Sequence, residues 1–277
     1  MSFTHYPKNI GILLSKNSFD FEKLDFLKSN LSKTVIIRVY GLAGVGKGTL
    51  SENLSNILEI PNLESSMILR AATFGYLKLK LELNQQNTKK IFDKISIQIV
   101  ENCLEFSFEG QVLDKKDLKA PEIDKNVTDF SSNVFIRQKF DETLDELVQE
   151  TFKTACVADG RGALEPYLLK AEKLGFTVIR ILLDSSDEIK AQRYYGSFIK
   201  NKKSKNPNFV EEIEHKAEFL EEFEHNIVKR NNKDIQNILE KDLGLISLDS
   251  GLIDTSNLSP QEVLEIALGF IQKKLAN

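Results

Sequence analysis

Residues 41–49 read Gly41-Leu42-Ala43-Gly44-Val45-Gly46-Lys47-Gly48-Thr49, and they separate an apolar run from a segment with helical spacing. The run at 34–39 is rich in β-branched residues and predicts a buried strand, whereas residues 50–58 predict a helix. A glycine-rich loop in this context directs backbone N–H groups at phosphate oxygens. Its glycines permit backbone conformations closed to residues with a Cβ, and Lys47 adds a positive charge. We therefore predict that all nine residues bind the phosphates of ATP.

The loop is a variant of the Gly-x-x-x-x-Gly-Lys pattern, because Gly48 follows the lysine and the hydroxyl comes one place later at Thr49. A threonine hydroxyl at the start of such a helix is a ligand for the Mg²⁺ that accompanies ATP. The alternative is an ordinary glycine turn between a strand and a helix, which would not need the lysine. We therefore predict nucleotide binding, with Thr49 as a magnesium ligand.

Composition points to a small ligand. The chain has 277 residues, 41% of them hydrophobic, with a formal net charge of -4, so it can bury a core and lacks the basic excess of a nucleic-acid-binding protein. Cys103 and Cys156 lie in apolar stretches without metal spacing, which predicts buried thiols in a reducing compartment. No run reaches the roughly eighteen apolar residues of a membrane span. We expect a cytoplasmic monomer that binds neither nucleic acid nor membrane.

The chain divides into an N-terminal extension, residues 1–33, and one domain, residues 34–277. Apolar pairs at 12–13 and 26–27 suggest that the extension forms a helix packed on the core. The patterns of the domain predict helical regions over 66–100, within 121–152 with a break near 131–132, and from 185. They predict a hairpin of 104–108 with 111–113 and strands at 155–158, 177–183 and 251–254. A terminal helix begins with Ser259 as its cap and Pro260 in its first turn. The inward stripe of the second helix within 121–152 is predicted at Val134, Phe135, Phe140, Leu144 and Leu147.

Strands that alternate with helices predict an α/β fold of three layers, in which helices cover both faces of a parallel sheet. Asp159 directly follows the apolar strand at 155–158, where a phosphate-binding-loop protein places the acid that orients the magnesium shell. The other interpretation is a turn aspartate before Gly160, which the presence of the glycine loop disfavours.

Arginine is rare in this chain, with seven arginines against thirty lysines. A guanidinium grips phosphate with two parallel hydrogen bonds, which an ammonium does not do. The arginines that follow candidate motif positions are Arg70, Arg137, Arg161, Arg193 and Arg230. For any one of them a surface ion pair is the alternative, but together they predict a phosphate-rich site.

Several separated segments resemble the cytidylate kinases, within the nucleoside monophosphate kinase family, over about residues 34–275. The glycine loop with Gly48 after the lysine is similar to that family's variant. The segments Glu64-Ser65-Ser66-Met67-Ile68-Leu69-Arg70, Val134-Phe135-Ile136-Arg137, Ala158-Asp159-Gly160-Arg161, Arg230-Asn231-Asn232-Lys233-Asp234 and Gly251-Leu252-Ile253-Asp254-Thr255-Ser256 are similar to further family motifs.

The resemblance implies phosphoryl transfer from ATP, with Mg²⁺, to a nucleoside monophosphate, preferably CMP or dCMP. It implies a monophosphate-binding insertion at about 64–152 and a helical lid at about 190–235. The catalytic residues would be Lys47, Asp159, Arg161 and Arg193, with Thr49 and Asp159 on the metal. The acceptor would be bound by Ser65, Arg70, Arg137, Arg161, Arg230 and Asp234. Spacing alone would equally allow Arg230 and Asp234 to form a plain ion pair one helical turn apart.

The chain departs from the family pattern mainly where the acceptor base is recognised. Gly162 stands where the family has an aspartate, Leu69 replaces a tyrosine, Lys119 and Asn237 replace arginines, and Tyr40 replaces an acid. These positions matter more for selecting the base of the acceptor nucleotide than for transferring the phosphoryl group. The alternatives are a monophosphate kinase with another or relaxed acceptor such as UMP, an ATP-binding regulator with little transfer, and a small-metabolite kinase on the same fold.

Overall fold

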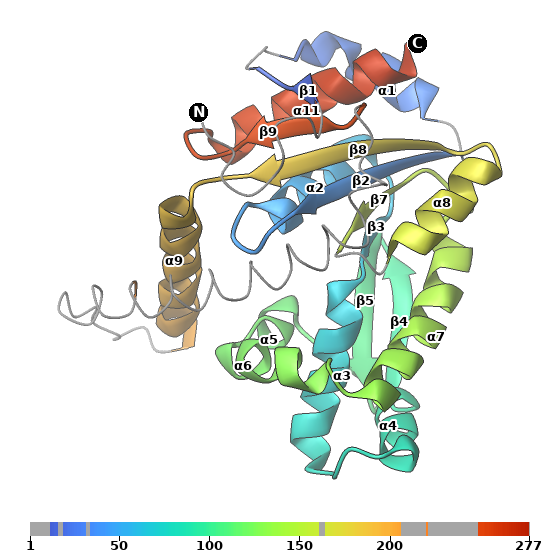
Figure 1. Cartoon of the computed structure of the whole chain (residues 1–277), viewed down its shortest axis with the longest axis vertical. Helices are drawn as coiled ribbons and strands as arrows, with labels where there is room; N and C mark the ends of the chain where they lie inside the picture. Colours follow the sequence, from blue (N-terminus) through green and yellow to red (C-terminus); the bar gives the residue numbers. More distant parts are fainter. Residues whose placement is uncertain are drawn as a thin grey trace.

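The computed structural model describes residues 12–15, 19–31, 34–160, 164–205, 220 and 249–276. Within this part of the chain, nine strands form a single sheet with the order β1-β9-β8-β2-β7-β3-β5-β4, and β6 pairs with β5 (Figure 1). The strands are β1 (Ile12–Leu13), β2 (Val35–Gly41), β3 (Asn62–Glu64), β4 (Ile95–Val100), β5 (Cys103–Phe108), β6 (Gln111–Val112), β7 (Cys156–Asp159), β8 (Thr177–Asp184) and β9 (Gly251–Asp254).

Helices connect and cover these strands. They are the short 3₁₀ helix η1 (Phe21–Lys23), α1 (Leu24–Asn30), α2 (Lys47–Leu58), α3 (Ser66–Leu79), α4 (Gln85–Phe92), α5 (Lys115–Leu118), α6 (Pro121–Phe130), α7 (Val134–Thr151), α8 (Glu165–Lys173), α9 (Asp187–Lys205) and α11 (Pro260–Leu275). Pairing is parallel from β1 through β3 to β5, so the predicted α/β fold with helices on a mostly parallel sheet is confirmed.

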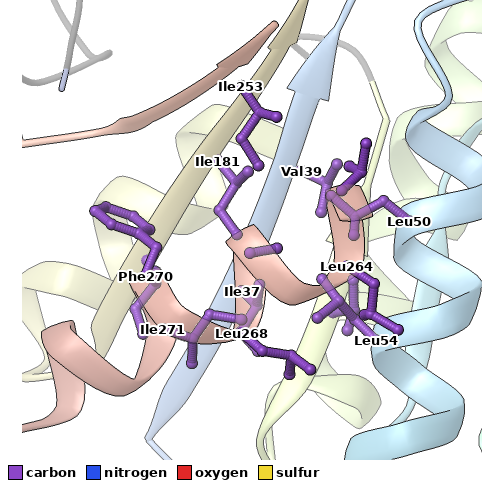
Figure 2. Close-up of a cluster of buried hydrophobic side chains, with 14 of the residues drawn as sticks. Ile37, Val39, Leu50, Leu54, Ile181, Ile253, Leu264, Leu268, Phe270 and Ile271 are labelled. Carbon is purple, nitrogen blue, oxygen red and sulfur yellow. The ribbon is translucent and has the colours of Figure 1, made fainter. Parts of the chain in front are cut away.

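The central strand β2 separates two hydrophobic cores. Ile37 and Val39 pack with residues of β8, β9, α2 and α11 on one face, as Figure 2 shows, whereas Ile36 packs with residues of α3, α7 and α8 on the other. This alternation follows from the two-residue period of a strand. Because both faces are covered, the apolar run before the glycine loop is buried, as predicted, and it holds the loop at the carboxyl end of the sheet.

Leu268→Ala should strongly destabilise the fold. Leu268 is fully buried on α11 and belongs to the core that contains Ile37 and Val39 (Figure 2). Truncating a buried leucine costs about 2–5 kcal/mol, because the cavity closes only in part. Urea unfolding of Leu268→Ala beside the exposed control Lys273→Ala measures the difference. Equal unfolding midpoints in the two variants would contradict the placement of α11.

The prediction of helix over the whole of 66–100 was wrong at its end. Ile95–Val100 forms β4, which pairs antiparallel with β5 and is the edge strand of the sheet at this side. Alternating isoleucines at 95, 97 and 99 suit a strand with one face against the protein. The predicted hairpin of β5 with β6 is confirmed, and the sheet is therefore mixed rather than wholly parallel.

The extension at the N-terminus contributes more than the predicted helix. Residues 24–30 form α1, in which Leu27 is buried, so a packed helix is confirmed there. Ile12 and Leu13 instead form the edge strand β1, parallel to β9, with both side chains exposed. These residues form a strand because the free edge of β9 offers hydrogen-bonding groups to β1, and local sequence patterns do not reveal such a distant partner.

Other expectations have mixed outcomes. The break between α6 and α7 is confirmed, and α11 carries the predicted cap, in which Ser259 and Glu262 form a capping box. Val134, predicted to face inward, is 68% exposed because α7 begins there, and Cys103 is exposed at the start of β5. Cys156 is buried as predicted. None of the helices in the described ranges combines the length and the apolar character needed to span a membrane.

Candidate active site

The glycine loop lies between β2 and α2, as the sequence predicts. Gly41, Gly44 and Gly46 all have positive φ angles, of 144°, 84° and 97°. These conformations strongly favour glycine, which explains the spacing of the three residues. A Cβ at Gly41 would also approach the carbonyl oxygen of Leu183 on β8 to 2.6 Å. The loop is therefore held in a conformation that its glycines make possible.

Helix α2 begins at Lys47, and Gly46 precedes it without a side chain to cap it. The first-turn N–H groups of a helix need partners from outside the helix, and the helix dipole makes an anion a favourable one. The ammonium of Lys47 donates a hydrogen bond to the carbonyl of Leu42 across the loop, at 2.8 Å. Thr49 is exposed on the first turn. The loop, the first turn of α2 and Lys47 thus have the arrangement that the predicted phosphate cradle requires.

Two carboxylates meet beside this cradle at the ends of adjacent parallel strands. Asp159 ends β7, Glu64 ends β3, and the two residues are in register. A Cβ built at Gly48 would lie 3.9 Å from Asp159 Oδ2 and 3.9 Å from Glu64 Oε1, so both carboxylates face the first turn of α2. Asp159 therefore lies at the end of its strand and beside the helix that follows the glycine loop, as the sequence predicts.

The side chains present fit a magnesium ion. Mg²⁺ prefers oxygen ligands, usually one or two carboxylates together with waters and substrate phosphates. Asp159 and Glu64 provide carboxylates beside α2, and Thr49 provides a hydroxyl on the turn that they face. These three oxygen-bearing side chains beside the glycine loop are the reason that the site fits Mg²⁺.

Asp159 has an unusual electrostatic environment. It is 5% exposed, and burial raises the pKa of its carboxyl. The nearby charge of Glu64 raises that pKa further. Lys47, Arg38 and Lys119 act in the opposite direction without cancelling the shift. A cation close to Asp159 would stabilise its ionised form.

Glu64 is held by two lysines from α5, on opposite sides of its carboxylate. Lys115 Nζ lies 3.3 Å from Oε2 and Lys119 Nζ lies 3.3 Å from Oε1. Burial alone would raise the pKa of Glu64, but Lys119 and Lys115 outweigh it and lower the pKa below its ordinary value. Lys115 also pairs with Glu52 on α2, at 3.5 Å. Four charged side chains from three segments therefore lie together beside the first turn of α2.

Ser65, predicted to bind the acceptor, follows Glu64 and packs against the end of β7. Its N–H and hydroxyl both donate to the carbonyl of Asp159, at 3.1 and 3.3 Å. A Cβ at Gly160 would come within 2.1 Å of the Ser65 hydroxyl oxygen, so Gly160 allows this close contact. The structure thus brings Ser65 and Asp159 together at one corner of the site.

The two predicted acceptor arginines of the insertion have different surroundings. Arg70 on α3 donates to Asp124 at 2.5 Å and to the carbonyl of Leu118 at 3.0 Å, so it holds α5 and α6 in place. Arg137 is exposed on α7, with its guanidinium 6.0 Å from the ring centre of Phe140. Arg70 therefore contacts protein partners in this structure, and Arg137 is open to solvent.

Arg193, predicted to be catalytic, lies on α9 against the back of the glycine loop. It donates to the hydroxyl and the carbonyl of Thr255, at 2.8 and 2.5 Å, and to the carbonyl of Val45, at 3.4 Å. Burial lowers its pKa, although Asp254 opposes the shift. In this arrangement Arg193 connects α9 and the end of β9 to the loop.

A buried polar cluster, which we call the Arg38 cluster, lies behind Asp159 and consists of Arg38, Tyr40 and Glu165. Arg38 is fully buried and donates to Glu165 at 3.2 Å and to the carbonyls of Ala158 and Gly160, each at 3.1 Å. Tyr40 donates a short hydrogen bond to Glu165, and burial raises its pKa. The cluster fixes the chain on both sides of Asp159 and attaches it to α8.

Some predicted site residues lie outside the described part of the chain, namely Arg161, Arg230 and Asp234. Conversely, sequence reasoning gave no role to Glu64 by itself, to Lys115 or to the Arg38 cluster. The signal for Glu64 was present, because it follows a buried strand just as Asp159 does. The signal for the lysines was their spacing of four residues, which places them on one side of a helical turn.

Comparisons with known proteins agree with this geometry. The family model "Cytidylate kinase" matches residues 37–273. A cytidylate kinase of Aquifex aeolicus is 24% identical over 240 residues, which cover 86% of this chain and 96% of that protein. Cytidylate kinase 1 of Haemophilus influenzae is 28% identical over 241 residues, covering 86% and 94%.

A crystal structure of a putative kinase from Chloroflexus aurantiacus covers 87% of this chain and 98% of its own, at 12% identity and a TM-score of 0.40, a likeness too slight to carry an argument. The family match, by contrast, extends from the strand before the glycine loop to the last helix. It therefore includes the glycine loop, both carboxylates, α5 and the capped helix α11. The chain belongs to the cytidylate kinase family.

Proposed function

We propose that this protein transfers the γ-phosphoryl group of ATP to CMP or dCMP, forming ADP and the nucleoside diphosphate. One observation carries the proposal: Asp159 and Glu64 face the first turn of α2 beside a glycine loop, in a chain that matches the cytidylate kinase family over 37–273. This places carboxylates where the phosphates of ATP would meet a second nucleotide. The relatives named cytidylate kinase support CMP as the acceptor.

The reaction needs alignment and charge compensation more than proton transfer. The phosphate of the acceptor is already an anionic nucleophile, so a strong general base is not required. Lys47 and the amides of the glycine loop would hold the β and γ phosphates, and Thr49 and Asp159 would hold the metal. When bound there, Mg²⁺ would supply charge compensation for the transferring phosphoryl group. Positioning and electrostatic stabilisation supply most of the rate enhancement in such transfers.

The acceptor site would lie between the glycine loop and the insertion at 64–152. Ser65 is placed next to Asp159, and we propose that it and Arg70 contact the acceptor phosphate once the Asp124 pair of Arg70 rearranges. The remaining acceptor contacts would come from Arg137, Arg161, Arg230 and Asp234. Arg193 would act on the transferring phosphates from α9, at the start of a lid at about 190–235.

The same proposal includes Mg²⁺ as the metal, a monomeric protein and action in the cytoplasm. The donor set of two carboxylates and a hydroxyl supports Mg²⁺. Cys103 and Cys156 are both free thiols, which agrees with a reducing compartment.

The test is the rate of ADP formation from Mg²⁺-ATP with CMP, dCMP, UMP and AMP measured side by side. We expect the highest kcat/KM with CMP or dCMP. UMP belongs in the panel because Gly162 stands where the family has an aspartate, and a preference for UMP would make UMP the acceptor. ATP binding without ADP release on addition of any acceptor would contradict the proposed transfer and favour a regulatory protein.

A further inference from the structure

We propose that Lys115 and Lys119 form a two-lysine clamp for the phosphoryl group in transit, and that Glu64 is their counter-ion when no nucleotide is bound. The inference rests on the proposed function, because it concerns the same site. It assigns a phosphate-binding role to α5, a helix of four residues that lies beside the first turn of α2.

The geometry places both ammonium groups at the phosphate cradle. Lys119 Nζ lies 4.0 Å from the position of a Cβ built at Gly48. Gly48 belongs to the first turn of α2, whose N–H groups would face phosphate. Lys115, one turn earlier on α5, reaches the same carboxylate of Glu64 from the other side and also contacts Glu52 on α2. Two cations from one short helix are thus held next to the place where a transferred phosphoryl group would pass.

A purely structural role explains this arrangement poorly. The side chains of Lys115 and Lys119 are each 42% exposed, and such ion pairs contribute about 0–1 kcal/mol to stability. Helix α5 already has a cap, since Asp114 accepts a hydrogen bond from the N–H of Lys116, and Arg70 holds its C-terminal end through the carbonyl of Leu118. The helix therefore does not depend on the lysines for its position.

The lysines are suited to changing partners. A lysine ammonium on a flexible four-carbon chain can move by several ångströms without any movement of the backbone. An incoming phosphoryl group carries more negative charge than the single carboxylate of Glu64 and would compete for both ammonium groups. Glu64 would then be left beside Asp159, where a metal ion would compensate both carboxylates. One exchange of partners would close the clamp and complete the metal site.

The experiment measures metal-free binding of a bisubstrate compound in which adenosine and cytidine are joined through five phosphates, using calorimetry. The variants are Lys115→Ala, Lys119→Ala and the double change, with Lys116→Ala as the matched control, because Lys116 is exposed on the same helix. CMP alone is the comparison ligand, since it lacks the bridging phosphates. Thermal unfolding of every variant verifies that α5 and the fold persist.

We expect Lys115→Ala and Lys119→Ala each to weaken bisubstrate binding about tenfold, which corresponds to about 1.4 kcal/mol, and the double change to weaken it further. The Lys116→Ala control should change bisubstrate affinity less than about twofold. Lys115→Ala and Lys119→Ala should weaken binding of CMP alone less than they weaken binding of the bisubstrate compound, because CMP lacks the bridging phosphates. Glu64→Gln should strengthen metal-free binding of the bisubstrate compound, because the lysines no longer have to leave a carboxylate.

Unchanged bisubstrate affinity in the lysine variants, or an equal loss with Lys116→Ala or with CMP alone, would overturn the clamp. Weaker binding by Glu64→Gln would overturn the role of Glu64 as a counter-ion. Failure of the proposed function is recognised separately, by the lack of CMP-dependent ADP formation in the unchanged protein. The clamp is judged only on ratios of dissociation constants between the variants and that protein.

Discussion

Lys47→Ala should lower kcat about 10³-fold while leaving the fold intact. The ammonium of Lys47 lies over the glycine loop and would stabilise charge on the phosphoryl group in the transition state. Removing one such preorganised electrostatic contact typically costs about 10²–10³-fold in kcat. The side chain is only half-buried and belongs to neither hydrophobic core, so its loss should cost little stability.

Steady-state kinetics with ATP and CMP, together with thermal unfolding, test this expectation. Lys90→Ala is the matched control, because Lys90 is exposed on α4, away from the glycine loop. The control should retain normal turnover. Near-normal kcat in Lys47→Ala would show that the loop does not handle the transferred phosphate in the way we propose. A loss of fold in that variant would show that the lysine has a structural role instead.

Asp159→Asn should lower turnover about 10²-fold and at the same time stabilise the nucleotide-free protein. Burial raises the pKa of Asp159, so the ionised carboxylate is less favourable in the folded chain than in the unfolded chain. Between the ordinary aspartate value and the raised value, the unfolded state loses its proton first, and the folded state of the wild type loses stability as pH rises through this window. Asparagine has no proton to lose.

The stability gain of Asp159→Asn should therefore be absent in acid and grow towards neutral pH. Urea unfolding of both proteins between about pH 4 and pH 7, without metal or nucleotide, measures the difference. The gain should shrink when Mg²⁺ and ATP are added, because the wild type alone keeps the carboxylate that the metal needs. A variant that is less stable than the wild type at neutral pH would contradict the assigned role of burial.

Local patterns predicted the parts of the fold that depend on local structure. The strand, loop and helix around Lys47 follow from β-branched residues, glycine spacing and helical periodicity within about twenty residues. Asp159 was found because parallel strands end at one edge of a sheet, where ligands bind. The cap at Ser259 was found because its signal lies within four residues.

Features that depend on distant partners were not predicted. Local spacing predicts helix over 66–100 and misses β4, because the alternation of β4 becomes decisive only when β5 lies beside it. The pairing of Glu64 with Lys115 and Lys119 joins β3 to α5, and the bond between Arg38 and Glu165 joins residues 127 positions apart. Arg38 lies within the strand predicted at 34–39, but its partner cannot be deduced from spacing.

The Arg38 cluster also constrains how this protein can diverge. Replacing Arg38 alone would leave the buried Glu165 carboxylate without its guanidinium, and replacing Glu165 alone would remove the carboxylate that pairs with Arg38, so we expect each single change to cost more than the double one. Loss of this pair therefore requires coordinated changes in β2 and α8. A chimera whose β2 lacks the arginine would therefore also need an α8 without the glutamate.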